Sequence, residues 1–275
     1  MTPWLLLLIP IIGLFAWMRF EAGWLEVCRI PVQGGPGFRI AVLSDLHPAY
    51  CRIKPDRAHA VLLAEKADLV LFLGDAADNA QQIETSAAWL QACARGIPAF
   101  AVLGNHDHKL FAEHPELLPV YRRALADAGL RLCMDERLRF GSGRRAILLT
   151  ALDDFRQRSE RLPEGPGVPY ASGTLDESAG TQPFHLVFTH NPQRIADLPP
   201  GYADYAVAGH FHGGQIWMPF GLEFRLFRKE PLGRAGVRRG SHTVNGMPVY
   251  LTRGIGNVLF PLRLGARPEI TILEL

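Results

Sequence analysis

The stretch Ala41-Val42-Leu43-Ser44-Asp45-Leu46-His47 decides both the fold and the site of this chain. An apolar run, typical of a buried strand, ends abruptly in an acid, and a histidine follows two positions later. Alternate residues of an extended chain point to the same side, so Asp45 and His47 can face one cation together. A carboxylate oxygen and an imidazole nitrogen both bind metals. The stretch therefore predicts part of a metal site at the carboxyl end of a strand.

The composition is that of an ordinary globular protein. Of the 275 residues, 48% are hydrophobic and 20% are charged. The net charge of +2 is too small to indicate a nucleic-acid partner. The four cysteines form no CxxC pair, so a cysteine-based zinc site is not expected. Free thiols fit a reducing compartment, and a disulfide is the alternative.

The amino end is apolar and uncharged from Trp4 to Met18, and Arg19 follows it. The run lacks the basic region and the small-residue cleavage site of a signal peptide. Trp4 and Trp17 stand at its two ends like the aromatic belt of a membrane helix. We therefore expect residues 1–20 to be a membrane anchor that spans the bilayer or lies in it, with a buried core helix as the alternative. The position of Arg19 then places the body of the protein on the cytoplasmic side.

Strands and helices alternate over the first half of the chain. A linker, residues 21–37, holds a short strand at Glu26 to Val32, and one catalytic domain covers residues 38–275. Further strands are expected at Phe38–Leu43, Asp68–Leu73 and Pro98–Leu103, and helices at Asp56–Lys66, Glu84–Arg95 and Glu116–Ala128. This alternation is typical of an α/β domain. The second half is expected to contain strands with shorter links, at Arg131–Arg139, Arg144–Leu152, Phe184–Thr189, Tyr205–Ala208, Val244–Thr252 and Glu269–Leu275. The residues from Arg156 to Gly180 are expected to form a long loop.

Acids, amides and histidines follow several of these strands. They are Asp45, His47, Asp75, Asn105, His106, His190, His210 and His212. Each piece is weak alone, because a Gly-Asp pair usually marks a turn and a lone histidine is usually structural. A His-x-His pair is stronger, since two imidazoles on one face commonly share a metal. Five such pieces in one chain favour a metal site over turn chemistry.

The chain resembles the calcineurin-like metallophosphoesterase superfamily in five motifs that occur in family order. They are Asp45-x-His47, Gly74-Asp75-x-x-Asp78, Gly104-Asn105-His106-Asp107, His190 and Gly209-His210-x-His212. A more specific resemblance is to the membrane-associated bacterial branch often called YkuE- or YaeI-like phosphoesterases. It lies in Thr189-His190-Asn191-Pro192, Gly213-Gly214-Gln215 and Arg253-Gly254-Ile255-Gly256. The resemblance implies a sandwich of two mixed β-sheets flanked by helices (αββα), held at the bacterial inner membrane.

The resemblance also implies a dinuclear metal site. Asp45, His47 and His212 would hold the first ion, Asn105, His190 and His210 the second, and Asp75 would bridge the two. Oxygen and nitrogen ligands without thiolate suit Mn, Fe or Zn, and we expect two Mn ions. A hydroxide that bridges the ions would attack phosphorus in line with the leaving oxygen.

His106 is expected beside the metals rather than on them. It would donate a proton to the leaving oxygen or steady the phosphate charge, with Asp78 as the carboxylate that polarises it. Asp107 is given no role beyond orienting its loop. Of the other histidines, His59 is expected on a helix, and the rest are interpreted as solvated or turn residues, namely His108, His114, His185 and His242. His108 is also kept as a weak candidate for substrate contact. Asp153-Asp154 is interpreted as a turn, with a position facing the cleft as the alternative.

The segment from Trp217 to Arg239 alternates apolar residues with arginines and should border the site. It is either a solvated loop or a surface that meets anionic headgroups and acyl chains. With the anchor, it favours an amphiphilic phosphodiester or pyrophosphate substrate, such as the lipid-linked nucleotide UDP-2,3-diacylglucosamine. A phosphomonoesterase or protein phosphatase with the same site is the alternative enzyme. A non-catalytic scaffold of the same fold is the alternative outside catalysis, and it predicts eroded motifs.

Overall fold

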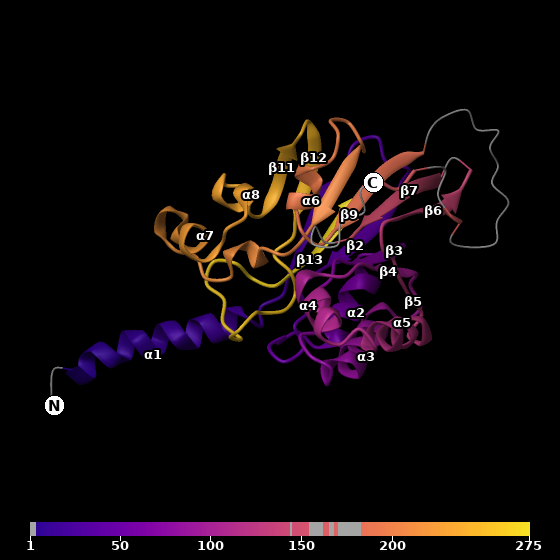
Figure 1. The fold of residues 1–275 in the computed structure, drawn as a ribbon. Coiled ribbons are helices and arrows are strands. Elements are labelled where there is room, and N and C mark those ends of the chain that lie inside the picture. Colours follow the sequence, from indigo (N-terminus) through magenta and orange to yellow (C-terminus); the bar gives the residue numbers. More distant parts are fainter. Residues whose placement is uncertain (1–3, 144, 154–161, 165–167, 170–182) are drawn as a thin grey trace.

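The computed structural model describes residues 4–143, 145–153, 162–164, 168–169 and 183–275. Two β-sheets pack against each other, and helices cover the outer face of each sheet (Figure 1). This is the αββα sandwich that the resemblance implied. Most of the loop expected over Arg156 to Gly180 lies outside the described residues, and within it Val168–Pro169 forms a two-residue strand, β8.

The first sheet carries the amino-terminal half of the chain. Its strand order is β1 (Glu26–Pro31), β13 (Glu269–Glu274), β2 (Arg39–Leu43), β3 (Leu69–Phe72), β4 (Ala99–Ala101) and β5 (Leu130–Leu132). Strands β2 to β5 are parallel, and β13 runs antiparallel to β2 and parallel to β1. The helices that cover its outer face include α2 (Pro55–Ala64), α3 (Gln82–Ala94) and α5 (Leu117–Asp127).

The second sheet is built from the carboxyl-terminal half. Its strand order is β11 (Gly240–Val244), β12 (Met247–Leu251), β10 (Tyr205–Ala208), β9 (Phe184–Thr189), β7 (Arg145–Leu152), β6 (Glu136–Ser142) and β8. Strands β12, β10, β9 and β7 are parallel, while β11 runs antiparallel to β12 and β6 antiparallel to β7. Strands β6 and β8 are parallel. Its outer face is packed by residues of three short helices, α6 (Gln193–Ala196), α7 (Leu222–Phe227) and α8 (Pro231–Arg234).

The core between the sheets follows the period of two along each strand. In β2, Ile40 and Val42 point between the sheets, whereas Ala41 and Leu43 point towards the helices. All four are fully buried, which explains the continuous apolar run at this strand. Strand β2 is therefore packed on both faces, and it holds the residues that follow it, Ser44 and Asp45, in a fixed position.

Three sequence expectations are wrong in detail. The strand expected over Arg131–Arg139 is two strands, β5 and β6, which belong to different sheets. The strand expected over Val244–Thr252 is part of the β11–β12 hairpin, which turns at Asn245 and Gly246 with φ of 50° and 75°. Both central residues of a tight type I′ turn need such a positive φ.

The helix α4 (Asn105–Glu113) was not expected at all. The Gly104-Asn105-His106-Asp107 motif was expected to follow the strand Pro98–Leu103 directly, with no helix behind it. It is the start of this helix, so the side chains of residues 105–108 leave the backbone with helical spacing.

The amino-terminal helix α1 (Trp4–Glu21) extends away from the sandwich (Figure 1). Ile9, Ile12 and Phe15 on it are each more than half exposed. In the parts of the chain that the structure describes, we find no helix with the length and hydropathy to cross a bilayer. The membrane anchor stays a prediction.

Candidate metal centre

The carboxyl ends of strands from both sheets meet at one edge of the sandwich. The loops that leave them are joined by backbone hydrogen bonds, from the Asp45 N–H to the Gly74 carbonyl at 3.0 Å and from the His47 N–H to the Asp75 carbonyl at 3.1 Å. In the second sheet, the Gly209 N–H donates to the His190 carbonyl at 3.0 Å. These backbone hydrogen bonds fix the positions of the loops relative to one another.

Asp45 and His47 face each other for a reason that differs from the predicted one. Strand β2 ends at Leu43, and both residues lie beyond it with φ of 57° and 40°. Asp75, His210 and His212 also have positive φ, at 54°, 74° and 50°. Asp and His adopt this left-handed region more readily than most residues, but at an energetic cost. Turns of the backbone, rather than strand alternation, aim these side chains at a common point.

Two glycines let the loops approach closely enough. A Cβ on Gly209 would lie 1.9 Å from Ser44 Oγ, and one on Gly104 would lie 2.2 Å from Asp75 Oδ1. Gly209 follows a strand of the second sheet, whereas Ser44 follows a strand of the first. The absence of a side chain at Gly209 therefore permits the contact between the two sheets.

The first group of ligand atoms consists of Asp45, His47 and His212, all buried. His212 Nε2 lies 3.3 Å from Asp45 Oδ1. Asp45 Oδ1 and His47 Nε2 are buried and have no hydrogen-bond partner in the described part of the chain. Buried polar atoms are nearly always paired, so two orphaned acceptors aimed at one point indicate a cation site.

The second group consists of Asp75, His190 and His210, also buried. His190 Nε2 lies 3.3 Å from Asp75 Oδ2, 3.1 Å from His210 Nδ1 and 3.1 Å from Asn105 Oδ1. The other ring nitrogen, Nδ1, donates to the Leu73 carbonyl at 2.6 Å. The lone pair of His190 Nε2 therefore points into the group.

Asp75 lies between the two groups. Its Oδ2 is 3.6 Å from His47 Nε2 in the first group and 3.3 Å from His190 Nε2 in the second. This is where a bridging carboxylate would stand. The structure thus brings all seven predicted ligands together, while their individual roles stay predictions.

The protonation states of these residues suit divalent cations. Burial lowers the pKa of His210 and that of His212, so both imidazoles are neutral and offer lone pairs. Burial opposes the ionisation of Asp75, yet the neighbouring histidines, His190 first, hold its pKa well below the usual range. Neutral imidazoles with ionised carboxylates form a nitrogen and oxygen donor set. The residues fit a pair of divalent ions of the Mn, Fe or Zn type.

Asp78 serves two histidines with one oxygen. Its Oδ1 lies 2.9 Å from His106 Nδ1, as predicted, and also 2.8 Å from Nδ1 of the ligand His47. Burial opposes the ionisation of Asp78, but His106 and His47 together lower its pKa. The link to His47 was not predicted. It requires that Nδ1 carry the proton, which leaves His47 Nε2 as the metal-facing nitrogen.

Asp107 orients the loops of the site through four backbone N–H groups. Its Oδ2 accepts from Asp75 and Gly104, each at 2.8 Å, and its Oδ1 accepts from Ala76 at 3.1 Å and Ala77 at 2.8 Å. Burial and the Asp75 charge raise the pKa of Asp107 to about 6. One side chain thus ties the loop after β3 to the start of α4.

Two of the remaining histidines were misinterpreted. His108 is buried on α4, and its Nε2 lies 2.6 Å from Oδ1 of the equally buried Asp153, so neither residue is solvated. His185 lies inside β9, 2.7 Å from Thr150 Oγ1. His242 also lies in a strand, β11, whereas His59 is helical as expected. Asp154 lies outside the described residues.

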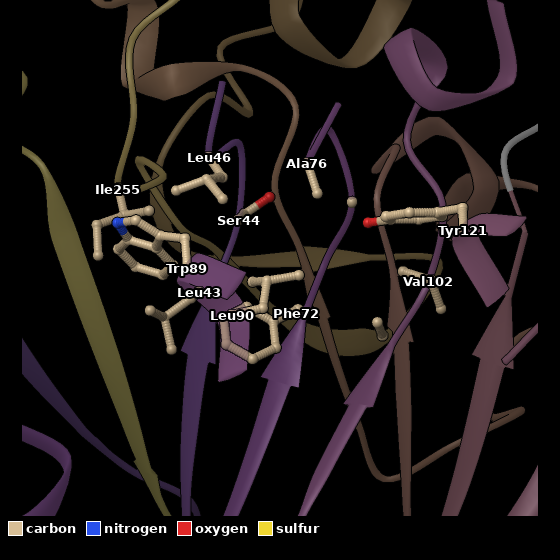
Figure 2. Close-up of a pocket in the computed structure, with 12 residues that line it drawn as sticks. Leu43, Ser44, Leu46, Phe72, Ala76, Trp89, Leu90, Val102, Tyr121 and Ile255 are labelled. Carbon is tan, nitrogen blue, oxygen red and sulfur yellow. The ribbon is translucent and has the colours of Figure 1, made fainter. Parts of the chain in front are cut away.

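A small apolar cavity of about 10 Å³ lies beneath the metal ligands. Figure 2 shows Leu43 and Phe72 at the ends of β2 and β3, with Trp89 and Tyr121 from the covering helices beside them. Except for Ser44, Trp89 and Tyr121, the side chains labelled in Figure 2 are hydrocarbon. A rigid apolar floor therefore supports the polar cluster, as close packing in protein interiors requires.

A much larger cavity of about 440 Å³ opens beside the metal centre. Its lining includes the site residues Asp75, Asn105, His106, His210 and His212. Most of the remaining lining is apolar and is called the apolar wall below; apart from Gly214, Gln215, Glu223 and Arg228 it consists of Phe211, Ile216, Met218, Phe224, Val258, Leu259 and Phe260. The segment from Trp217 to Arg239, taken as a loop or a lipid-facing surface, contains α7 and α8 and borders the site as predicted.

Comparison with known proteins agrees with this geometry. The sequence profile described as calcineurin-like phosphoesterase matches residues 38–214. The chain is 29% identical to the uncharacterized metallophosphoesterase YkoQ of Bacillus subtilis, with 85% of this chain and 82% of YkoQ covered. It is 28% identical to the phosphodiesterase YaeI of Escherichia coli, with 95% and 92% covered. With the uncharacterized metallophosphoesterase YkuE of Bacillus subtilis it shares 27% identity, with 88% and 80% covered.

The matched range contains every predicted metal ligand as well as His106 and Asp78. It spans well over half of the chain and includes strands of both sheets. The family uses a dinuclear metal site, and the two groups of ligand atoms lie where such a site requires them. This chain belongs to the calcineurin-like phosphoesterase family and is a hydrolase that acts on phosphoester bonds.

Proposed function

We propose that this hydrolase is a phosphodiesterase that cleaves a phosphodiester or pyrophosphate bond in an amphiphilic substrate. The observation that carries the proposal is the cavity with one metal-binding wall and one apolar wall. The name of the relative YaeI, a phosphodiesterase, supports the bond type. When bound, the two divalent ions would supply a hydroxide nucleophile and bind the phosphate oxygens.

His106 is suited to donate the proton that the leaving oxygen needs. Its side chain is 36% exposed and lines the cavity, while its Nδ1 is held by Asp78 at 2.9 Å. Because Asp78 holds Nδ1, Nε2 is the ring nitrogen left to exchange a proton with the leaving oxygen. The backbone N–H of His106 also donates to Asp75 Oδ1 at 2.8 Å, which fixes the main chain of His106 beside the metal groups.

The apolar wall indicates what the rest of the substrate looks like. Phe224, Leu259 and Phe260 lie within one cavity with the metal ligands, so a hydrocarbon group bound there would place its phosphate at the metals. Arg228 lines the same cavity and offers a cation to a second phosphate. A nucleotide-linked lipid such as UDP-2,3-diacylglucosamine has this combination of groups.

Exposed apolar residues around the cavity support a membrane partner. Phe220 is 86% exposed, and Leu226 and Leu259 are each 67% exposed. The exposed helix α1 is fastened nearby, because the Met18 carbonyl accepts from the Arg263 N–H at 3.1 Å. Large exposed apolar surfaces with basic neighbours suit a lipid interface. We place the protein at the cytoplasmic face of the bacterial inner membrane.

The two alternatives gain no support from the described residues. A phosphomonoesterase or protein phosphatase would use the same metal groups, but neither needs an apolar wall beside them. A non-catalytic scaffold predicts lost ligands, whereas every predicted ligand is present and converges with the others.

Hydrolysis by the full-length protein in detergent with Mn²⁺ tests the proposal. The substrates are an aryl phosphodiester, the matching monoester and UDP-2,3-diacylglucosamine. We expect the lipid-linked pyrophosphate to be preferred, and Phe260→Ser to reduce that preference more than it reduces aryl diester cleavage. Aryl diester activity without lipid activity would discard the amphiphilic substrate, and activity on the monoester alone would overturn the diesterase assignment.

A further inference from the structure

A carboxylate outside the seven predicted ligands contacts one of them. Glu230 lies between α7 and α8, and its Oε1 is 3.0 Å from His210 Nε2. Its other oxygen, Oε2, accepts from the Lys229 N–H at 2.9 Å, so the carboxylate is held in one orientation. We propose that Glu230 is a positioning residue that fixes the ring of His210 for the second metal ion.

The two nitrogens of His210 face different partners. Nδ1 lies 3.1 Å from His190 Nε2, inside the second group of ligand atoms, and Nε2 faces Glu230. A carboxylate can only accept a hydrogen bond, so Nε2 carries the proton and Nδ1 presents its lone pair to the metal. Histidine ligands of metals commonly depend on such a partner for their tautomer and orientation.

The backbone of His210 is held independently of Glu230. Its N–H donates to Asp45 Oδ2 at 3.1 Å, and its carbonyl accepts from the Arg228 guanidinium at 3.1 Å. The following residue, Phe211, packs edge to face against Phe224 of α7, with 5.7 Å between the ring centroids. Loss of the Glu230 carboxylate therefore releases the imidazole while the main chain stays in place.

Glu230 acts on one metal position and not on the other. The first group, Asp45, His47 and His212, is oriented by Asp78 through His47. Among the predicted ligands, all of which the structure describes, the Glu230 carboxylate is hydrogen-bonded to His210, a member of the second group, and to none of the first. The inference rests on the metal centre of the proposed function, and it adds that the α7–α8 segment supports the second ion as well as lining the cavity.

Metal titration of the metal-free, full-length protein in detergent tests this role without any substrate. Calorimetric titration with Mn²⁺ compares wild type with Glu230→Leu, which removes the acceptor, and Glu230→Gln, which keeps a neutral acceptor. Glu116→Gln is the matched control, because Glu116 pairs with His114 at 3.4 Å on the exposed surface, and neither residue is a ligand. The melting temperature of each metal-free variant is measured alongside.

We expect wild type and Glu116→Gln to bind two equivalents of Mn²⁺. In Glu230→Leu, one equivalent should bind about 10- to 100-fold more weakly and the other as in wild type. Glu230→Gln should fall between them, and no metal-free variant should melt earlier than wild type. Wild-type affinity for both equivalents in Glu230→Leu would overturn the inference. Equal weakening of both equivalents together with a lower melting temperature would do so too, since it would show a merely structural role. A wild-type protein that binds two ions yet cleaves no diester would refute the proposed function alone.

Discussion

The two sheets contribute different chemistry to one centre. The first sheet supplies both ligand carboxylates, Asp45 and Asp75, and the Asn105 amide, whereas the second supplies three of the four ligand imidazoles, His190, His210 and His212. In the first sheet, Asp107 accepts four backbone hydrogen bonds from the loops that carry Asp75 and Asn105, and Asp78 holds the ring of His47. Two of the predicted ligands from the second sheet are held through their rings, His190 by the Leu73 carbonyl and His210 by the Glu230 carboxylate.

This difference teaches that the centre exists only where the sheets meet. Negative charge from one side and neutral donors from the other form a site for divalent ions, and neither sheet holds a complete set. Asp75, from the first sheet, stands within 3.6 Å of an imidazole from each group. Substitution of a residue where the two sheets meet should therefore weaken the binding of both ions. Substitution of a residue within one sheet should weaken the binding of one ion or of neither.

The largest effect is expected for Asp75→Ala, which removes the carboxylate between the two groups. Both metal equivalents should bind more weakly, and diester hydrolysis should fall by more than about 100-fold, because loss of a residue that merely supports a ligand already costs up to that much. Metal content by mass spectrometry and the hydrolysis rate check this. Loss of one equivalent only would show that Asp75 does not bridge.

His106→Ala should separate catalysis from metal binding. We expect a loss of about 10²- to 10⁴-fold in turnover, the range of a general acid, with metal content unchanged. The control is Asp78→Asn, which should lower turnover as well but also weaken the first ion, since Asp78 holds His47. If His106→Ala lost metal too, His106 would have to be reassigned as a ligand.

Gly209→Ala tests the contact between the sheets. The added Cβ would lie 1.9 Å from Ser44 Oγ and 2.8 Å from Asp45 Oδ2, so one sheet must shift. We expect the free energy of unfolding to fall by about 1–3 kcal/mol, as for other overpacked cores, with weaker binding of the first ion. Urea unfolding measures it. Gly13→Ala on α1, where a Cβ would contact nothing within 4 Å, is the control.

The smallest effect concerns the second sheet alone. Burial, followed by the charge of Arg137, lowers the pKa of His185 to about 4. The unfolded chain takes up this proton near pH 6.5 and the folded chain only near pH 4, so stability falls as the pH decreases between these values. Because His185 is only half-buried, we expect at most about 1 kcal/mol between pH 7 and pH 5.

Urea unfolding of wild type and His185→Gln at both pH values measures this dependence. The variant should lose less stability on acidification than wild type does. An identical loss in both proteins would show that His185 is not the responsible group.

The residues that converge at the centre could be singled out from the sequence because each lies in a short motif next to an apolar strand. Asp45, Asp75 and His190 follow strands buried on both faces, and such strands are visible as apolar runs. The left-handed backbone of Asp45 and His47 was not visible, because it depends on the hydrogen bonds between loops that only the fold creates.

Features that depend on distant residues were missed. Glu230 reaches His210 across 20 positions, and no local pattern marks it. The division of Arg131–Arg139 between two sheets was also hidden, since the residues look extended throughout. The turn at Asn245-Gly246 was also missed, although an Asn-Gly pair between two strands is a local signal of a hairpin.

Crystallography of the Mn²⁺-soaked full-length protein, with anomalous scattering to locate the metal, tests the central claim most directly. We predict two Mn peaks, one on each side of Asp75 Oδ2, with Asp45, His47 and His212 around one and Asn105, His190 and His210 around the other. A single peak held by one sheet, or no peak between the sheets, would contradict the account.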